Sequence, residues 1–374
     1  MKKWIDKGYA VYRRLLYSMC GRPKSGVLSS WIPCQVEDPS VRETFGDVVH
    51  PCVRFIEEGF EGHRWWMVYT PYYGGNARIE NPRLCYSDAS VGVLPIDWKY
   101  YCTIMDQPEE GYNSDPTLLF EGGRMYVYWR ENYTPSSRSL GMSRATFGCC
   151  VENQRVHYLP EAQLVELNRH IDKELSPTFI SFRGHPRAYS LHFRFCSKLM
   201  YHFSNRLSRY VYHLLDYTEK LGFYSRYQCR GISIWEGDSF EGKFRYLKTV
   251  RIKGANRLYQ PWHMDLFFLP IEASGLYAVI QSHVNHPDIC LAKSEDGESF
   301  QMFVPPLITE DTLGMKGLYK SSAVIVDDVF YLFFTARDNN DLKLNRLFLA
   351  PISWEDLLKR LSRRKSRSRS VPED

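Results

Sequence analysis

The sequence predicts an all-β protein in which one structural unit is repeated five times. Aromatic residues make up 15% of the 374 residues, and their rings pack well on the pleated, half-buried surface of a sheet. Five segments also share one outline: a polar start, a short apolar strand, a turn rich in Gly, Asp or Pro, and a second strand with aromatic residues. These segments begin at His50, Ser114, Ser176, Trp262 and Lys320.

A second, outer hairpin is predicted between these segments. It is recognised in CYSDASVG, ISIWEGDSFEGKF and ICLAKSEDGESFQMF, where Asp296-Gly297 is a tight-turn signal. An inner and an outer hairpin make a four-stranded unit, and the spacing of roughly sixty residues fits a propeller blade. The sequence therefore predicts a five-bladed β-propeller over residues 45–352. The longer interval between residues 176 and 263 predicts an insertion or an extended outer hairpin in blade three.

Short helical extensions are predicted at both ends of the propeller. Residues 1–44 contain an amphipathic pattern, WIDKGYAVYRRLLYSM, followed by a connector rich in Gly, Pro and Ser. Residues 353–374 begin with SWEDLLKRLSRR, where Ser353 can cap a helix with Asp356 three residues on. The end of the chain, RRKSRSRSVPED, is predicted to be disordered.

Charge and apolar runs limit the classes of function. The net charge of +5 is concentrated in the C-terminal tail, so the body lacks the basic character of a nucleic-acid binder, and the tail offers only a weak contact to an anionic partner. The apolar run SSAVIVDDVFYLFF is interrupted by Asp327 and Asp328, which argues against a membrane span. Charged residues near the N-terminus argue against a signal peptide. We therefore expect a cytoplasmic protein, or one released or virion-associated if it is phage-encoded.

The ten cysteines follow no disulfide or metal-binding spacing, so we expect reduced, mostly buried thiols and no cofactor. The alternative to a site without a cofactor is a cation held jointly by His50, Asp115, His263 and Asp265. The expected ion in that case is a calcium ion that supports the site. No local ligand spacing such as HExxH accompanies these residues.

A shared site is predicted at one mouth of the ring. The first strand of each propeller blade lines the central channel, so the polar residues that begin these strands converge although they are distant in sequence. The expected neighbours are His50, Asp115, Ser176, His263 with Asp265, and Lys320.

These motifs resemble the five-bladed β-propeller glycoside hydrolases, the superfamily of arabinanases, β-xylosidases and β-fructosidases (families 43, 32 and relatives). The resemblance is carried by HPCV, WWMVYTPY with ENPRLCYSD, NSDPTLLF, SPTFI, PWHMDLFF, LYKSSAVI and the SEDGESF turn. It implies catalysis by two carboxylates, one a proton donor and the other a nucleophile or base. The sequence departs from this pattern in blade one, where His50-Pro51 stands in place of the family's Asp-Pro.

The resemblance implies roles for particular residues. Asp115 and Asp265 are the expected working carboxylates, Glu80 is the substitute acid, and His50 and His263 orient groups or handle protons. The residues expected to hold the glycan or oligosaccharide, besides the two histidines, are Asn81, Trp129, Trp262, Tyr319 and Lys320, with Trp65 and Trp66 as further sugar platforms.

The sequence is compatible with two main functions. The polar residue at every inner-strand start favours a glycoside hydrolase, whereas His50 in place of the blade-one Asp favours a non-catalytic propeller. Such a propeller would bind a glycan or serve as a structural component of a phage particle or a surface-glycan system. A third alternative is a cytoplasmic role in polysaccharide assembly, with the N-terminal basic segment on the membrane surface.

Overall fold

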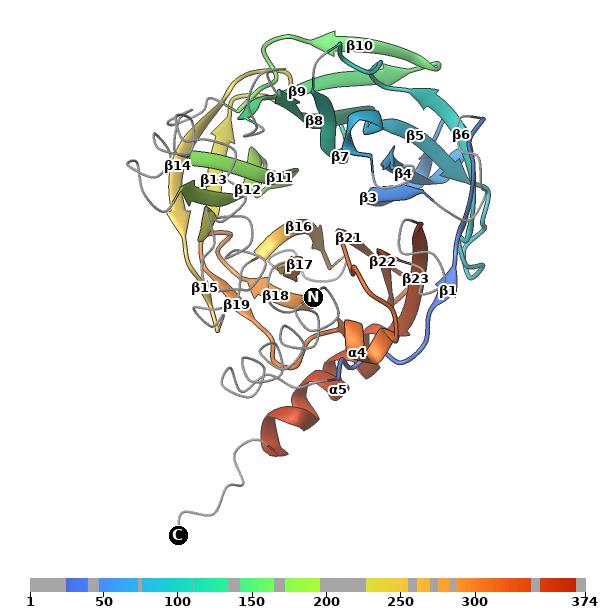
Figure 1. Ribbon diagram of the computed structural model, residues 1–374, viewed down its shortest axis with the longest axis vertical. Coiled ribbons are helices and arrows are strands. Elements are labelled where there is room, and N and C mark those ends of the chain that lie inside the picture. Colours follow the sequence, from blue (N-terminus) through green and yellow to red (C-terminus); the bar gives the residue numbers. More distant parts are fainter. Residues whose placement is uncertain are drawn as a thin grey trace, which may run out of the picture.

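The five sheets of the protein form a ring (Figure 1). The structure is a computed structural model that describes residues 25–39, 47–72, 76–109, 111–133, 142–164, 172–195, 227–254, 261–269, 275–282, 287–337 and 344–367. Each sheet is one blade, and its innermost strand faces the ring axis. The prediction of an all-β, five-bladed propeller is confirmed.

Within each blade, successive strands pair antiparallel, and their order in the sequence is their order from the ring axis outward. From blade one to blade five, these strands are β3 (Val48–Phe60), β4 (His63–Pro71), β5 (Arg83–Ser87) and β6 (Asp97–Thr103); β7 (Tyr112–Glu121), β8 (Arg124–Tyr133), β9 (Met142–Glu152) and β10 (Arg155–Leu159); β11 (Asp172–Phe182), β12 (His185–Phe195), β13 (Tyr227–Gly237) and β14 (Phe244–Val250); β16 (Pro261–Phe268), β17 (Leu276–Ser282), β18 (Asp288–Ser294) and β19 (Phe300–Met302); and β21 (Ser321–Val326), β22 (Val329–Arg337) and β23 (Asn345–Ser353).

Short strands connect neighbouring blades. β1 (Ile32–Pro33) pairs antiparallel with β23 on the outside of blade five, and β2 (Gln35–Glu37) pairs in parallel with β6 on the outside of blade one. β15 (Ile252–Lys253) likewise joins the outer strand β19 of blade four, and β20 (Ile308–Thr309) pairs with β18. Residues expected in the N-terminal extension therefore contribute two strands to the propeller sheets.

The inner hairpins share one kind of turn. In four blades two residues connect the inner pair of strands, and both have a positive φ. These pairs are Glu61-Gly62, Gly122-Gly123, Arg183-Gly184 and Asp327-Asp328. Two-residue turns with positive φ match the right-handed twist of antiparallel strands, so they set the register of each hairpin. In the sequence this turn is visible as four residue pairs that each contain Gly or Asp.

Aromatic side chains fill the spaces between blades. Trp65 and Trp66 are adjacent on β4 and therefore point to opposite faces of blade one. Trp65 packs against Tyr331 of blade five, with ring centroids 5.3 Å apart, whereas Trp66 packs in the cluster that contains Leu118 of blade two. Burial of rings this large contributes strongly to stability and explains the high aromatic content.

The C-terminal helix α5 (Trp354–Arg367) packs on the propeller. The backbone N–H of Asp356 donates to the hydroxyl of Ser353 at 3.2 Å, so the predicted cap is present. Leu357 and Leu361 are buried in the core that lies between blades four and five. Two short helices also lie within the described residues, α4 (Glu310–Leu313) and the 3-10 helix η2 (Ala77–Ile79).

Several predictions fall on segments outside the described residues. They are the N-terminal amphipathic helix, residues 196–226 of the long interval within blade three, and residues 368–374 at the basic end of the chain. Residues 363–367, which were also predicted to be disordered, instead form the last part of α5, so that part of the prediction is wrong. No helix in the part of the chain that the structure describes is long and apolar enough to cross a membrane. Six of the eight cysteines within that part are buried, as expected.

Candidate active site

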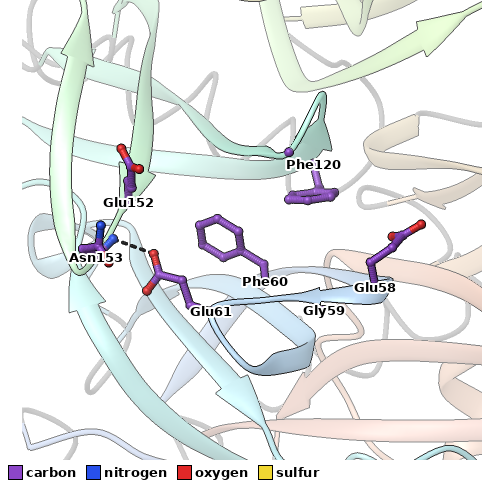
Figure 2. Close-up of a pocket in the computed structure, with 8 residues that line it drawn as sticks. Glu58, Gly59, Phe60, Glu61, Phe120, Glu152 and Asn153 are labelled. Carbon is purple, nitrogen blue, oxygen red and sulfur yellow. Dashed lines mark hydrogen bonds between the residues drawn. The ribbon is translucent and has the colours of Figure 1, made fainter.

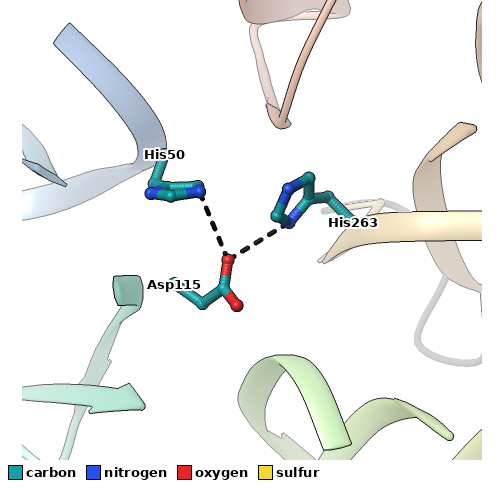
Figure 3. Close-up of side chains that lie close together, drawn as sticks. All are labelled: His50, Asp115 and His263. Carbon is teal, nitrogen blue, oxygen red and sulfur yellow. Dashed lines mark ion pairs between the residues drawn. The ribbon is translucent and has the colours of Figure 1, made fainter. Parts of the chain in front are cut away.

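The inner strands bring polar residues from different blades together at one end of the ring. His50 of β3, Asp115 of β7 and His263 of β16 are each no more than 2% exposed. Figure 3 shows the two imidazole rings on either side of the Asp115 carboxylate. Its Oδ1 atom lies 3.5 Å from His50 Nε2 and 3.1 Å from His263 Nδ1. The predicted convergence of these residues is therefore observed in the structure.

One backbone device directs three of the converging side chains. His50, Asp115 and Ser176 each precede a proline and have φ values of 55°, 52° and 47°. Each also lies where the register of its inner hairpin shifts. Proline donates no hydrogen bond to the ladder, and a bulge re-aims side chains. Positive φ at a non-glycine residue costs about 1–3 kcal/mol and is concentrated at functional sites.

Asp115 is held as an anion by a neighbouring arginine. Arg130 donates to Oδ2 of Asp115 through Nε at 2.9 Å and lies within 2.8 Å of it through Nη2, while Ser114 and Asn132 accept hydrogen bonds from the same guanidinium. Burial by itself raises the pKa of Asp115, but Arg130 and then His263 outweigh it and hold that pKa well below the usual range.

Glu80 has the opposite tendency on the other side of His50. Its Oε2 atom is 3.5 Å from His50 Nδ1, which also lies 3.0 Å from the hydroxyl of Thr70. Burial, and secondarily the negative charge of Asp115, raise the pKa of Glu80 well above its ordinary value. Burial also lowers the pKa of both His50 and His263 against the opposing effect of Asp115. The surroundings of the site thus favour the protonated form of Glu80, the ionised form of Asp115 and the neutral form of the His50 ring between them.

Three polar atoms in the cluster lack a hydrogen-bond partner among the described residues. They are Asp115 Oδ1, Glu80 Oε2 and His263 Nε2. A buried polar atom without a partner costs about 1–3 kcal/mol. His263 Nδ1, in contrast, lies 2.6 Å from the hydroxyl of Ser176. Two imidazoles and one carboxylate offer ligand atoms within 4.8 Å of one another, so His50, Asp115 and His263 could hold a metal ion.

Tyr319 and Lys320 lie beside this cluster, as predicted. The Tyr319 ring is 4.5 Å from the His263 ring and 5.2 Å from the His50 ring, measured between centroids. Lys320 donates from Nζ to the carbonyl of Pro116 at 3.1 Å. Burial lowers the pKa of Lys320, although Asp115 opposes this effect. Asn81, next to Glu80, is buried and accepts a hydrogen bond from Asn113 at 3.2 Å.

Asp265 is engaged elsewhere. Arg54 donates to both of its carboxylate oxygens, at 2.9 and 2.8 Å, and the Ser322 hydroxyl donates to Oδ2 at 2.5 Å. These contacts connect blades one, four and five and leave neither oxygen of Asp265 without a donor. A catalytic role of Asp265 stays a prediction, whereas its role as a brace between blades follows directly from the contacts.

The tryptophans lie mainly in packing positions. Trp129 is 1% exposed and belongs to the core between blades one and two, and Trp65 and Trp66 are equally buried. Trp262 is half-buried and packs edge-on against Phe193, with centroids 5.4 Å apart. We therefore give Trp129 no part in the proposed function.

Sequence reasoning missed Arg130, which provides the main counter-charge to Asp115. A signal was available, because the inner hairpin pairs Ser114 with Arg130, directly beside Asp115. Thr70 was missed for a similar reason: it lies on β4 opposite the start of β3 and reaches the His50 ring.

A depression of about 560 Å³ lies at the other end of the inner strands (Figure 2). It is bordered by the turns of blades one and two, where the rings of Phe60 and Phe120 lie 5.8 Å apart. Glu61 accepts a hydrogen bond from the backbone N–H of Asn153 at this edge. Phe60 ends strand β3 and His50 lies near its start, so this depression is separate from the polar cluster.

Comparisons with known proteins were made by sequence and by structure. No family model matches the sequence, and no curated protein matches it. The structure is similar to an N-acetylgalactosamine deacetylase from F. plautii, solved in complex with blood group B trisaccharide. The two sequences are 16% identical, the match covers 90% of this chain and 98% of that one, and the TM-score is 0.61.

Glycoside hydrolases are also similar in structure. A family 117 glycoside hydrolase from Zobellia galactanivorans is 12% identical, with 87% of this chain and 91% of that chain covered and a TM-score of 0.54. A GH43_1 enzyme from Xanthomonas citri, complexed with xylose, is 10% identical over the same shares, with a TM-score of 0.53. At these identities the likeness shows the fold alone, which is the fold that the sequence resemblance implied.

Proposed function

We propose that this chain hydrolyses a glycan and that the cluster around His50 is its active site. The observation that carries the proposal is the contrast between Glu80 and Asp115. These two carboxyl groups flank one imidazole, and their surroundings shift their pKa values in opposite directions. Pairs of this kind mark the acid and the base of a hydrolase. The similar structures include proteins described as acting on sugars, which supports a glycan substrate.

In cleavage of a glycosidic bond, Glu80 is the proton donor. Its proton passes to the leaving oxygen as the bond to the anomeric carbon breaks. The oxygen of one water bonds to that carbon, and a proton of the water passes to the Asp115 carboxylate. Return of a proton from Asp115 to Glu80 restores the resting state. General acid catalysis of this kind contributes about 10²–10⁴-fold to the rate.

A second reaction is favoured by His50 in place of a carboxylate. Removal of an acetyl group from an amino sugar breaks an amide bond: water adds to the carbonyl carbon, the C–N bond breaks, and the amine takes a proton from Glu80. The products are acetate and the free amino sugar. The F. plautii structure is described as an enzyme of this type, which supports testing the reaction here.

The test is to incubate the full chain with oligosaccharides that differ in sugar type and in N-acetylation, followed by mass spectrometry. Shorter sugars indicate glycosidase activity, and a loss of acetyl mass indicates deacetylation. We expect Glu80→Gln and Asp115→Asn each to lower the rate by about 10²-fold or more. His192→Gln is a matched control, because His192 is a buried histidine that contacts Glu174 outside the cluster. Glycan binding without any product would overturn the proposal in favour of a non-catalytic binding propeller.

A further inference from the structure

We propose that His50, Asp115 and His263 bind one divalent transition-metal ion of the zinc type at the centre of the ring. The binding itself does not depend on the proposed function, whereas the use of the ion in hydrolysis rests on it. The three residues come from blades one, two and four, and their ligand atoms lie within 4.8 Å of one another. Figure 3 shows both rings directed at the same carboxylate oxygen.

One unpartnered atom, Asp115 Oδ1, supports a missing cation. Asp115 Oδ1 faces both imidazoles but has no hydrogen-bond donor among the described residues. Each ring directs one nitrogen at this oxygen, His50 through Nε2 at 3.5 Å and His263 through Nδ1 at 3.1 Å, and imidazole nitrogens are common metal ligands. A cation among these three groups would satisfy the carboxylate oxygen and at the same time offset the cost of burying it.

The surrounding contacts orient the ligands as metal sites require. Arg130 holds Oδ2 of Asp115, which leaves Oδ1 directed at the two rings. His50 approaches Oδ1 through Nε2, while its Nδ1 lies near Thr70 and Glu80. A histidine ligand usually uses its second nitrogen for such a contact, which fixes the ring and its tautomer. The Ser176 hydroxyl, next to His263 Nδ1, would border the ion.

Positive charges near the site do not oppose the ion strongly. The guanidinium of Arg130 is already compensated by Asp115 Oδ2. The Lys320 ammonium donates to the Pro116 carbonyl, and its buried position lowers its pKa. One carboxylate and two neutral imidazoles are a sufficient set for a catalytic zinc ion, which takes three protein ligands and a water.

The donor set selects zinc over calcium. Calcium takes six to eight oxygen ligands, whereas imidazole nitrogens suit zinc and related ions. The calcium site expected from the sequence also includes Asp265. Both carboxylate oxygens of Asp265 instead accept hydrogen bonds from Arg54 or Ser322. Held by these three residues, such an ion would supply an activated water whose proton is released to solvent, so Asp115 would act as a ligand in place of its role as base.

The test uses the full chain after removal of metal with a chelator and a check of its fold by circular dichroism. Zn²⁺, Co²⁺ and Ca²⁺ are then titrated separately by calorimetry, without substrate. We expect one Zn²⁺ bound per chain, with Ca²⁺ weaker, and a visible absorption band from Co²⁺ held by nitrogen and oxygen ligands. Asp115→Asn and His263→Gln should each weaken Zn²⁺ binding by about 100-fold or more, and His192→Gln should leave it unchanged.

Three outcomes overturn the metal site: no Zn²⁺ binding and no Co²⁺ band in the native chain, Zn²⁺ affinity unchanged in both ligand variants, or Ca²⁺ bound more tightly than Zn²⁺. The Co²⁺ band is read on the native chain, so the test holds even where a variant fails to fold. Zn²⁺ binding without turnover of any glycan would support the site and overturn the proposed function. Equal turnover before and after chelation would support the function and overturn the catalytic use of the ion.

Discussion

Arg130 contacts a single oxygen of Asp115 through two of its nitrogens, Nε at 2.9 Å and Nη2 at 2.8 Å. The second oxygen of the carboxylate is thereby left for the two histidines. This arrangement keeps Asp115 ionised and its Oδ1 atom directed at the two histidine rings. The charge balance of the site therefore depends on Arg130.

Removal of Arg130 should destabilise the fold as well as the site. In Arg130→Met the Asp115 carboxylate stays buried without its main counter-charge, and breaking a buried pair in this way costs about 3–5 kcal/mol. Urea unfolding followed by tryptophan fluorescence measures the loss. A matched variant is Arg124→Met, which removes an ion pair with Glu241 at the surface, and it should leave the free energy of unfolding nearly unchanged. Equal effects of the two substitutions would contradict the assignment.

Asp265 has two possible roles that can be tested, a structural brace between blades and a catalytic carboxylate. Asp265→Asn should lower the free energy of unfolding by about 3–5 kcal/mol, because Arg54 loses a buried partner. Arg54→Met and the double variant complete a cycle that isolates the pair, and we expect a coupling energy above about 1 kcal/mol. If Asp265→Asn instead keeps full stability and loses glycan hydrolysis, the catalytic prediction made from the sequence is correct and the brace is not.

The pKa of Glu80 predicts a dependence of stability on pH. The folded chain holds the proton of Glu80 above its ordinary pKa of 4.5, whereas the unfolded chain releases it there. The contribution of this proton to stability is therefore complete below about pH 4.5 and is lost as pH rises through the folded pKa. The difference in unfolding free energy between the native chain and Glu80→Gln should shrink over this rise.

Loss of the Glu80 proton should also change the rate of catalysis. The rate of glycan hydrolysis should fall at high pH, where Glu80 loses its proton, and the residual rate of Glu80→Gln should lack that limb. Rates of both proteins from pH 4 to 9 provide the measurement. An identical high-pH limb in the two proteins would assign the limb to another group.

Replacement of His50 by Asp would reproduce the Asp-Pro pattern that the resembling glycoside hydrolases have in blade one. We expect His50→Asp to lower activity and zinc affinity by about 10- to 100-fold, because the shorter side chain removes a ligand and adds a like charge beside Asp115. Asp accepts the positive φ of 55° at this position more easily than most residues, so the fold should persist. A gain of glycosidase activity would show that paired carboxylates are sufficient.

The fold was predictable because its signal is repeated. The inner hairpins of four blades use the same kind of two-residue turn, so the repeat is visible without any knowledge of contacts. The convergence of His50, Asp115 and His263 followed from propeller geometry. Other features depend on partners that no local pattern specifies: Arg54 and Asp265 are 211 positions apart, and their pairing decides that Asp265 braces the blades.

The connecting strands were not predictable for a different reason. β1 has two residues and β2 has three, which is too short for any alternation of apolar and polar residues to be read. The cluster of unpartnered atoms in the site was likewise invisible, since a satisfied and an unsatisfied histidine have the same sequence signature.

The attachment of β1 to β23 has a consequence for biosynthesis. The last blade completes its sheet only when a strand from the beginning of the chain docks onto it, and Tyr319 and Lys320, which border the site, precede that blade directly. A nascent chain that still lacks β23 has no partner for β1 and an open ring. The ring can therefore close only after translation has delivered β23, so a product truncated before β23 would carry every proposed ligand in an open ring.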